Sequence, residues 1–264
     1  TLEGYLRTER DLVEVALLRA VAGFEEDAAL DREALAAVRH GVLSGGKRLR
    51  PILCVAAYQA CQGSGGGGGD ALYDLAVSLE LIHAYSLMHD DLPCMDDAEL
   101  RRGRPTTHRE HGEEVTMTAA AALIPLAARH ALVAARALGL DDAESRGLSR
   151  SLMEAAGAGG MVGGQWLDLL GEGEALGADA LGDLHRRKTG ALLTAALTLG
   201  ARAAQAEEER VRAVEIYGQA IGLAFQIADD ILDATASAEA LGKNPSDADL
   251  DKSTYVALYG LDGA

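Results

Sequence analysis

Residues 79–108 constrain the fold of this chain more than any other stretch. An apolar run is followed directly by two pairs of carboxylates and then by three arginines: Asp90, Asp91, Asp96, Asp97, Arg101, Arg102 and Arg104. A folded protein seldom gathers so many carboxylates at the end of an apolar segment unless a cation neutralises them. Oxygen ligands of this kind suit Mg²⁺, which also takes water and phosphate oxygens, and arginine binds phosphate. The stretch therefore predicts a buried helix that leads to a site for Mg²⁺ and phosphate.

A second acidic cluster repeats the pattern later in the chain. Residues 225–233 indicate a helix on which Asp229 and Asp233 stand four positions apart, about 6 Å from each other along one face. Two like charges at that spacing weaken a helix unless a cation lies between them. One acidic run alone is about as often a solvated helix face. Because both clusters continue from apolar sequence, we interpret them as parts of one metal site at the end of a buried cavity.

Composition favours helices and limits the partners. Ala and Leu dominate the 264 residues, and aromatic residues make up only 4%. A net charge of −17 would repel nucleic acid and anionic membranes, so neither is expected as a partner. No run of 18 or more apolar residues was identified, so an integral membrane segment is not expected. The three cysteines lack metal-ligand spacing and favour a reducing, cytoplasmic location.

Helical periodicity predicts a single all-α domain over residues 1–264. Helices are expected over four ranges among others: 2–22, 51–61, 113–138 and 179–199. Three aspartates are expected to cap helix N-termini: Asp31, Asp70 and Asp141. Trp166 is interpreted as an anchor in the core or in an interface.

Basic and histidine positions add to the acidic clusters. Gly45 and Gly46 allow a sharp turn that brings Lys47 and Arg50 together. His83 lies two helical turns before Asp90 and projects from nearly the same face. Alone, such a basic turn more often only caps a helix, and a histidine in an apolar helix is more often a core residue than a ligand.

Taken together, these motifs resemble those of a known family. Residues 90–96 with 101–103, and residues 229–233, resemble the two aspartate-rich motifs of the trans-isoprenyl diphosphate synthases, most of all the bacterial short-chain farnesyl and geranylgeranyl diphosphate synthases. The resemblance implies an isoprenoid-synthase-type helical bundle around a deep central cavity, usually as a homodimer. It implies Mg²⁺, with three ions around a bound diphosphate, and head-to-tail condensation of isopentenyl diphosphate with an allylic diphosphate. Members of the family continue into further C-terminal helices, so either such helices are missing after Ala264 or the site is more open.

The resemblance further implies roles for individual residues. Isopentenyl diphosphate would be bound by Gly46, Lys47, Arg50, His83 and Arg102. The allylic diphosphate would be handled by Arg101, Lys188, Thr189, Gln226 and Lys243. The metal ligands would be Asp90, Asp91, Asp96, Asp229 and Asp233. The catalytic residues would be Asp90, Asp91, Asp96, Arg101, Lys188, Asp229 and Asp230.

Product length should depend on where the apolar cavity is blocked. Tyr85 lies five residues before Asp90, about 7.5 Å further along the helix axis. In the family, an aromatic residue there, together with two extra residues inside the first motif, goes with a C15 product. A helical wheel alone would select Ser86 as nearer the Asp90 face, and Tyr85 could simply be a core aromatic. We predict farnesyl diphosphate as the product, with geranylgeranyl diphosphate as the alternative.

Two other protein classes fit part of the pattern. A class I terpene cyclase carries a similar first motif, but its second metal motif usually contains Asn, Ser or Thr, and Glu. A non-catalytic subunit of a heteromeric prenyl synthase would have degraded metal motifs, whereas both are intact here. The chain departs from the family pattern at Ala121, where Asp is usual, and at Val256, where Pro is usual.

Overall fold

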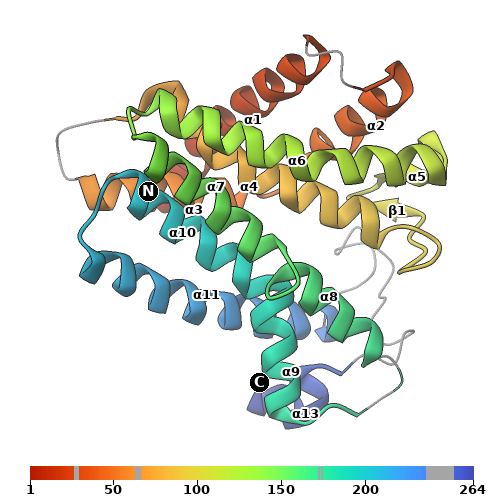
Figure 1. Cartoon of the computed structure of the whole chain (residues 1–264). Coiled ribbons are helices and arrows are strands. Elements are labelled where there is room, and N and C mark those ends of the chain that lie inside the picture. Colours follow the sequence, from red (N-terminus) through yellow and green to blue (C-terminus); the bar gives the residue numbers. More distant parts are fainter. Residues whose placement is uncertain (27–29, 63–66, 172, 174, 236–252) are drawn as a thin grey trace.

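Helices form almost all the regular structure in this computed structural model (Figure 1). The structure describes residues 1–26, 30–62, 67–171, 173, 175–235 and 253–264. The α-helices are α1 (Leu2–Glu26), α2 (Arg32–Val42), α3 (Leu49–Gln62), α4 (Gly69–Asp90), α5 (Thr107–His111), α6 (Glu113–Ala137), α7 (Asp142–Ala156), α8 (Met161–Leu170), α9 (Ala178–His185), α10 (Ala191–Ala203), α11 (Glu208–Thr235) and α13 (Tyr255–Gly263). The prediction of an all-α fold is confirmed.

Two short irregular elements interrupt the helices beside the first acidic cluster and before α10. Strands β1 (Leu100–Arg101) and β2 (Arg104–Pro105) form a small antiparallel ribbon. Gly103, with a φ of +73°, makes the tight reversal between them. The π-helical turn η2 (Arg186–Gly190) joins α9 to α10 within the run expected to be one helix. Single π turns inside helices often mark functional sites.

Helix α4 is the centre of the bundle. It packs against α1, α2, α3 and α6, so its side chains are buried around most of its circumference. This burial explains why its sequence is a continuous apolar run rather than an amphipathic stripe. The buried side chains include Leu72, Leu75, Leu79, Leu81, Ile82 and Met88. The core therefore surrounds the helix whose last residue is Asp90.

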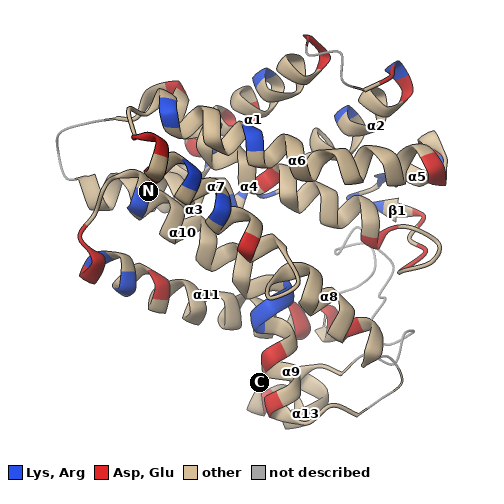
Figure 2. Cartoon of the chain, viewed as in Figure 1, with Lys and Arg blue, Asp and Glu red and all other residues tan. Residues whose placement is uncertain are grey.

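Helix α10 forms a second internal element. It lies between α3 and α11 in Figure 1 and packs against both. Figure 2 shows charged residues mainly at helix ends and on outer faces, and α10 carries only Arg202 near its C-terminus. Gly200 allows α10 to approach α3, because a Cβ atom there would overlap the backbone of Cys54. These contacts hold η2 and α11 beside the end of α4.

Two of the three expected helix caps are confirmed. Asp31 Oδ1 accepts a hydrogen bond from Ala34 N at 2.7 Å. Asp141 and Glu144 form a reciprocal capping box at the start of α7. Both aspartates satisfy N–H groups that a first helical turn leaves without an intrahelical partner.

The prediction that Asp70 caps α4 is wrong. The helix begins one residue earlier, and its N-cap is Gly68. A Cβ atom at Gly68 would collide with the side chains of Leu72 and Leu138, so close packing selects glycine there. Asp70 instead lies in the first turn, where its negative charge is favourable near the positive end of the helix dipole.

By length and composition, α6 is the one helix in the described part of the chain that could cross a membrane. A core helix of a water-soluble protein passes the same test, and α6 packs against α2, α4 and α7. Its buried face is made largely of small residues: Ala119, Ala120, Leu123, Ala127, Ala131, Ala134 and Ala135. The expectation of no integral membrane segment stays a prediction.

Candidate active site

The chain reverses on itself directly after α4. Asp91 N still donates to Leu87 O at 3.0 Å, but Asp96 N donates to Asp90 O at 2.9 Å. Pro93 lacks an N–H group and cannot continue the helical hydrogen bonding. The backbone therefore forms an irregular turn that brings Asp96 back to Asp90.

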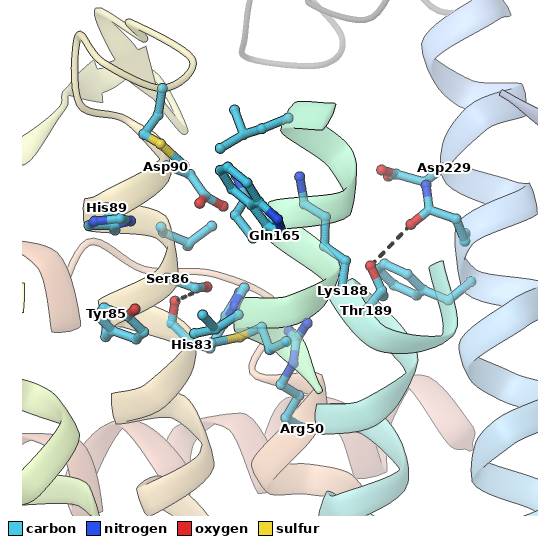
Figure 3. Close-up of a pocket in the computed structure, with 18 residues that line it drawn as sticks. Arg50, His83, Tyr85, Ser86, His89, Asp90, Gln165, Lys188, Thr189 and Asp229 are labelled. Atoms are coloured by element: carbon cyan, nitrogen blue, oxygen red, sulfur yellow. Dashed lines mark hydrogen bonds between the residues drawn. The ribbon is translucent and has the colours of Figure 1, made fainter. Parts of the chain in front are cut away.

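A cavity of about 400 Å³ opens beside the end of α4. Its lining contains nine of the residues predicted to bind substrate or metal or to set product length: Arg50, His83, Tyr85, Ser86, Asp90, Lys188, Thr189, Gln226 and Asp229. Figure 3 shows Asp90 and Asp229 on opposite sides of the cavity, with Lys188 between them. Three segments far apart in the sequence thus meet at one end of an apolar space.

The carboxyl group of Asp90 is held in an environment that disfavours its charge. Burial raises its pKa to about 7, the cation of Lys188 opposes this shift, and the negative charge of Asp96 adds to it. A divalent cation would relieve both the desolvation and the repulsion. Asp90 therefore has the chemistry of a metal ligand.

Two predicted catalytic aspartates make other contacts in this structure. Asp91 is buried and forms a bidentate pair with Arg101, whose Nε lies 2.8 Å from Oδ1 and 3.0 Å from Oδ2. Asp230 is also buried, and its carboxylate accepts from Gln226 Nε2 at 2.9 Å and from the backbone N of Tyr255 at 2.7 Å. Neither aspartate lines the cavity described above. Asp91 orients Arg101, and Asp230 joins α11 to α13.

Two further predicted metal ligands, Asp96 and Asp233, lie outside the lining of the first cavity. Both are half-buried. In the described part of the chain, no group of three or more His, Cys, Asp or Glu side chains is arranged to hold a metal ion by itself. Mg²⁺ accepts one or two carboxylates when phosphate oxygens and water complete its shell. The donor set present here fits that pattern.

Lys188 reaches the cavity from the π turn η2. Its Nζ lies 2.5 Å from Asp168 Oδ2 on α8. One residue later, Thr189 Oγ1 donates to Gln226 Oε1 at 3.1 Å, which joins η2 to α11 (Figure 3). These contacts hold the lysine ammonium group between the two acidic clusters.

Gly164 permits the contact between α8 and η2. A Cβ atom at this position would overlap the backbone of Lys188. We expect Gly164→Ala to lower the free energy of unfolding by about 1–3 kcal/mol, because backbone atoms cannot move aside as a flexible side chain can. The measurement is urea unfolding followed by circular dichroism.

Gly147 provides the matched control for that substitution. It lies in α7, is exposed, and has open space where a Cβ atom would be placed. Gly147→Ala should therefore raise the unfolding free energy by up to about 1 kcal/mol through helix propensity. Equal effects of the two alanines would show that α8 and η2 are not packed as described.

A second cavity, of about 520 Å³, adjoins the first. Arg50, His83 and Phe225 line both cavities. The second is otherwise lined by the predicted isopentenyl diphosphate ligands Gly46, Lys47 and Arg102, with Arg10, Arg48, Leu49, Glu80 and Leu193. Burial, and then the nearby cations beginning with Arg50, lower the pKa of His83 well below its usual value. His83 is therefore a neutral imidazole among arginines.

Glycine backbone and a buried ion cluster shape the loop before α3. Gly46 has a φ of +140°, and a Cβ atom there would overlap the guanidinium of Arg102, which donates to Gly45 O. Arg48, also in the left-handed region at φ +52°, turns inward. It is 3% exposed, and its guanidinium pairs with Glu80 Oε1 at 2.8 Å and Glu14 Oε1 at 2.7 Å. Arg48 is thus fixed in the interior, and Lys47 and Arg50, which precede and follow it in the chain, line the second cavity.

The interpretation of Trp166 as a core anchor is wrong, because the residue is 60% exposed and lines the first cavity. The alternative, an anchor in an interface, stays a prediction. Lys243 lies outside the described residues, so its predicted role stays a prediction.

Sequence reasoning also missed the apolar lining from α8, namely Met161, Val162 and Leu169. Their spacing with Gln165 and Trp166, along one helical face, was the available signal.

The protein is thus all-α and has two adjoining cavities. The lining of one includes carboxylates and apolar side chains, and the lining of the other includes lysine and several arginines. Comparison with known proteins agrees with this class. The model of the polyprenyl synthetase family matches residues 32–264. The chain belongs to the polyprenyl synthetase family.

Several plant enzymes are similar to this chain in sequence. The chain is 44% identical over 230 residues to geranylgeranyl pyrophosphate synthase 11, chloroplastic, of Arabidopsis thaliana, covering 86% of this chain and 63% of that protein. It is 43% identical over 230 residues to geranylfarnesyl diphosphate synthase, chloroplastic, of Leucosceptrum canum, covering 86% and 62%. The chain thus spans a little less than two thirds of the length of these relatives.

Several solved structures of bacterial enzymes are similar to this chain. An FPP/GFPP synthase from Zymomonas mobilis superposes with a TM-score of 0.83 at 32% identity, covering 98% of this chain and 86% of that one. A geranyltransferase from Helicobacter pylori, in complex with magnesium and isoprenyl diphosphate, gives a TM-score of 0.78 at 30% identity, covering 96% and 84%. These likenesses extend over nearly the whole chain and support the family assignment.

Proposed function

We propose that the chain is a short-chain prenyl diphosphate synthase that condenses isopentenyl diphosphate with an allylic diphosphate in a head-to-tail reaction. The arrangement of two adjoining cavities carries this proposal. One contains Asp90, Lys188 and Asp229, and the other contains Lys47, Arg102 and neutral His83. A bisubstrate reaction between two diphosphates needs two such pockets, whereas a cyclase needs one. The family membership and the magnesium in the Helicobacter pylori structure also support it.

The chain's own residues would position and stabilise the reacting groups. Asp90 and Asp96 on one side and Asp229 on the other would hold Mg²⁺, three ions when a diphosphate is bound. When bound, Mg²⁺ neutralises the charge that develops on the departing diphosphate. Lys188 would add a fixed positive charge on the same group, and Arg50 and His83 would orient isopentenyl diphosphate beside it.

The apolar lining would exclude water from the electron-deficient allylic carbon. Attack by the double bond of isopentenyl diphosphate forms the new carbon–carbon bond. Loss of a proton from the adduct, with the departing diphosphate as acceptor, restores a double bond. No nucleophilic side chain is needed, so the roles of the protein are orientation, charge stabilisation and shielding.

The function is tested by incubating the protein with Mg²⁺, labelled isopentenyl diphosphate and, separately, C5, C10 or C15 allylic primers. Products would be dephosphorylated and sized by chromatography. Elongation of any primer supports the synthase. Cyclised hydrocarbon from one diphosphate alone would support a cyclase, and Mg²⁺-dependent stabilisation by a diphosphate analogue without turnover would support a non-catalytic subunit.

We propose a C15 product, farnesyl diphosphate. Tyr85 and Ser86 both line the cavity, so a side chain of α4 at this level can limit its depth. The ring of Tyr85 lies 5.9 Å from that of His89, between centroids, and is half-buried. The named plant relatives favour a C20 product as the second candidate.

Tyr85→Ala is expected to shift the product from C15 to C20 or longer, because removing the ring deepens the cavity by more than one methylene group. Products are sized as above. Tyr217→Ala is the matched control, since Tyr217 is 57% exposed on α11 and does not line the cavity. An unchanged product distribution in Tyr85→Ala would refute the role of Tyr85 in chain length.

We further propose a homodimer of single-domain subunits in the cytoplasm. The chain's net charge of −17 and its similarity to bacterial enzymes support a location away from anionic membranes. The chloroplastic names of the plant relatives apply to those proteins. Light scattering after size-exclusion chromatography would measure the mass of the assembly, and a monomeric mass would contradict the dimer.

A further inference from the structure

Trp166 occupies an unusual position for the only tryptophan of the chain. It is 60% exposed, yet it lines the acidic cavity. It shares one face of α8 with Met161, Val162, Gln165 and Leu169, which line the same cavity. A large indole is thus presented to an apolar space without being covered by the protein.

The position of the indole follows from the contacts of α8 with Lys188. Asp168 Oδ2, two residues after Trp166, lies 2.5 Å from Lys188 Nζ. Gly164 holds the middle of the helix against the backbone of Lys188. Trp166 therefore lies between two residues of α8 that contact Lys188, and it lines the cavity that Asp90 and Lys188 also line.

A ligand with an anionic head and a hydrocarbon tail would satisfy both parts of this lining. Its head would meet Lys188 and the metal-binding carboxylates, and the start of its tail would pass the indole. Tryptophan suits such a boundary because its ring is apolar and flat while its N–H group can remain hydrated. Covering the exposed ring would remove apolar surface from water and favour binding.

We propose that Trp166 is a substrate-contacting and specificity-determining residue whose indole covers the first isoprene unit of the allylic substrate, next to the diphosphate. This inference rests on the proposed function. Its role differs from that of Tyr85, because a wall beside the first unit contacts C5 and C10 primers alike. A residue at the far end of the tail would affect only the longer chains.

Intrinsic fluorescence tests the contact directly, since all tryptophan emission comes from this residue. The full chain would be titrated with geranyl thiolodiphosphate, a slowly reacting analogue, in the presence of Mg²⁺. Inorganic diphosphate with Mg²⁺ is the control that has the head group but no tail. We expect the analogue to shift the emission to shorter wavelength and inorganic diphosphate to leave it nearly unchanged. Equal shifts with both ligands would overturn the proposal.

Calorimetry with the same ligands distinguishes a failure of the proposed role of Trp166 from a failure of the proposed function. Analogue binding with unchanged emission would refute the role of Trp166 and leave the proposed function intact. Absence of both analogue binding and primer elongation would overturn the proposed function and this inference together. An emission shift that depends on protein concentration, without ligand, would identify a contact between two copies and refute the substrate contact.

Substitutions provide the second test. Trp166→Ala should raise KM for dimethylallyl and geranyl diphosphate by about tenfold each through lost apolar contact, with KM for isopentenyl diphosphate within about threefold. Trp166→Phe should restore most of the loss. Leu170→Ala truncates another exposed apolar side chain of α8, which does not line the cavity, and should behave as wild type. Wild-type KM values in Trp166→Ala would refute the proposal.

Discussion

Asp90→Asn is expected to lower kcat/KM for prenyl transfer by about 10²–10³-fold or more, because the amide keeps the shape of the side chain but loses its negative charge. Asp90 lines the cavity, and burial already raises the pKa of its carboxyl group to about 7. An uncharged side chain there removes a ligand for Mg²⁺ and leaves the departing diphosphate less well neutralised. The measurement is steady-state elongation of geranyl diphosphate across a range of Mg²⁺ concentrations.

The Asp90→Asn variant should lose activity without losing stability. A buried carboxylate near Asp96 is costly in the metal-free protein, so removing its charge should leave the free energy of unfolding unchanged or slightly higher. Loss of activity with a normal unfolding transition would therefore locate the effect in the chemistry. A similar loss of both would mean that Asp90 is mainly structural.

Asp97→Asn is the matched control for the same chemical change. Asp97 lies in the same turn, but it is exposed and does not line the cavity. Asparagine also tolerates its left-handed backbone, with φ +44°. The activity of Asp97→Asn should stay within about threefold of wild type. This change is much smaller than the loss expected when a group that stabilises the transition state is removed. Equal losses in both variants would contradict a specific role for Asp90.

Arg48→Met is expected to lower the free energy of unfolding by about 3–5 kcal/mol. The guanidinium of Arg48 is 2% exposed and neutralises Glu80, whose side chain is 4% exposed. Methionine fills similar space but leaves that carboxylate buried without its cation. Both residues carry a Cβ atom, so the left-handed backbone at position 48 contributes equally to the two proteins. Urea unfolding measures the change.

Two further variants test the physical cause. Arg39→Met breaks an ion pair with Glu25 at 2.7 Å whose side chains are 50% and 40% exposed, and it should cost less than about 1 kcal/mol because water replaces the partner. Adding Glu80→Gln to Arg48→Met should recover a large part of the lost stability. If the double variant is no more stable than Arg48→Met, the buried charge is not the source of the cost.

The same buried cluster affects the site as well as the stability. Glu80 lies on α4 three residues before His83, and Arg48 lies between Lys47 and Arg50 in the loop before α3. Their 2.8 Å contact therefore joins the cationic loop to the helix that ends at Asp90. This contact joins elements that line the two cavities.

Much of the site could be predicted from sequence because its signals are local. The apolar run of α4 followed by Asp90, and the carboxylates at i and i+4 on α11, depend on helical geometry and charge within a few residues. Lys47, Arg50 and His83 were identified with the help of the family resemblance, and the structure places all three around one cavity. The N-caps Asp31 and Asp141 are equally local.

Other features depended on contacts between distant residues. In the sequence, Asp91 and Asp230 cannot be distinguished from the other aspartates of their motifs. In the fold, Asp91 accepts a hydrogen bond from Arg101, and Asp230 accepts one from the backbone N of Tyr255. The π turn at Lys188 accompanies the close approach of Gly164, which lies 24 positions earlier in the chain. No pattern within one helix indicates such pairings.

The amino-acid sequence by itself determined the helices, the two acidic motifs and the kind of ligand that they suit, since these follow from periodicity and charge along the chain. Only the tertiary structure decided which of those carboxylates face the cavity, that the two pockets adjoin through Arg50 and His83, and that Trp166 is exposed beside the first cavity rather than buried in the core. The physical reason is that a side chain's exposure and charge environment are set by whatever packs against it, and here those neighbours come from other helices.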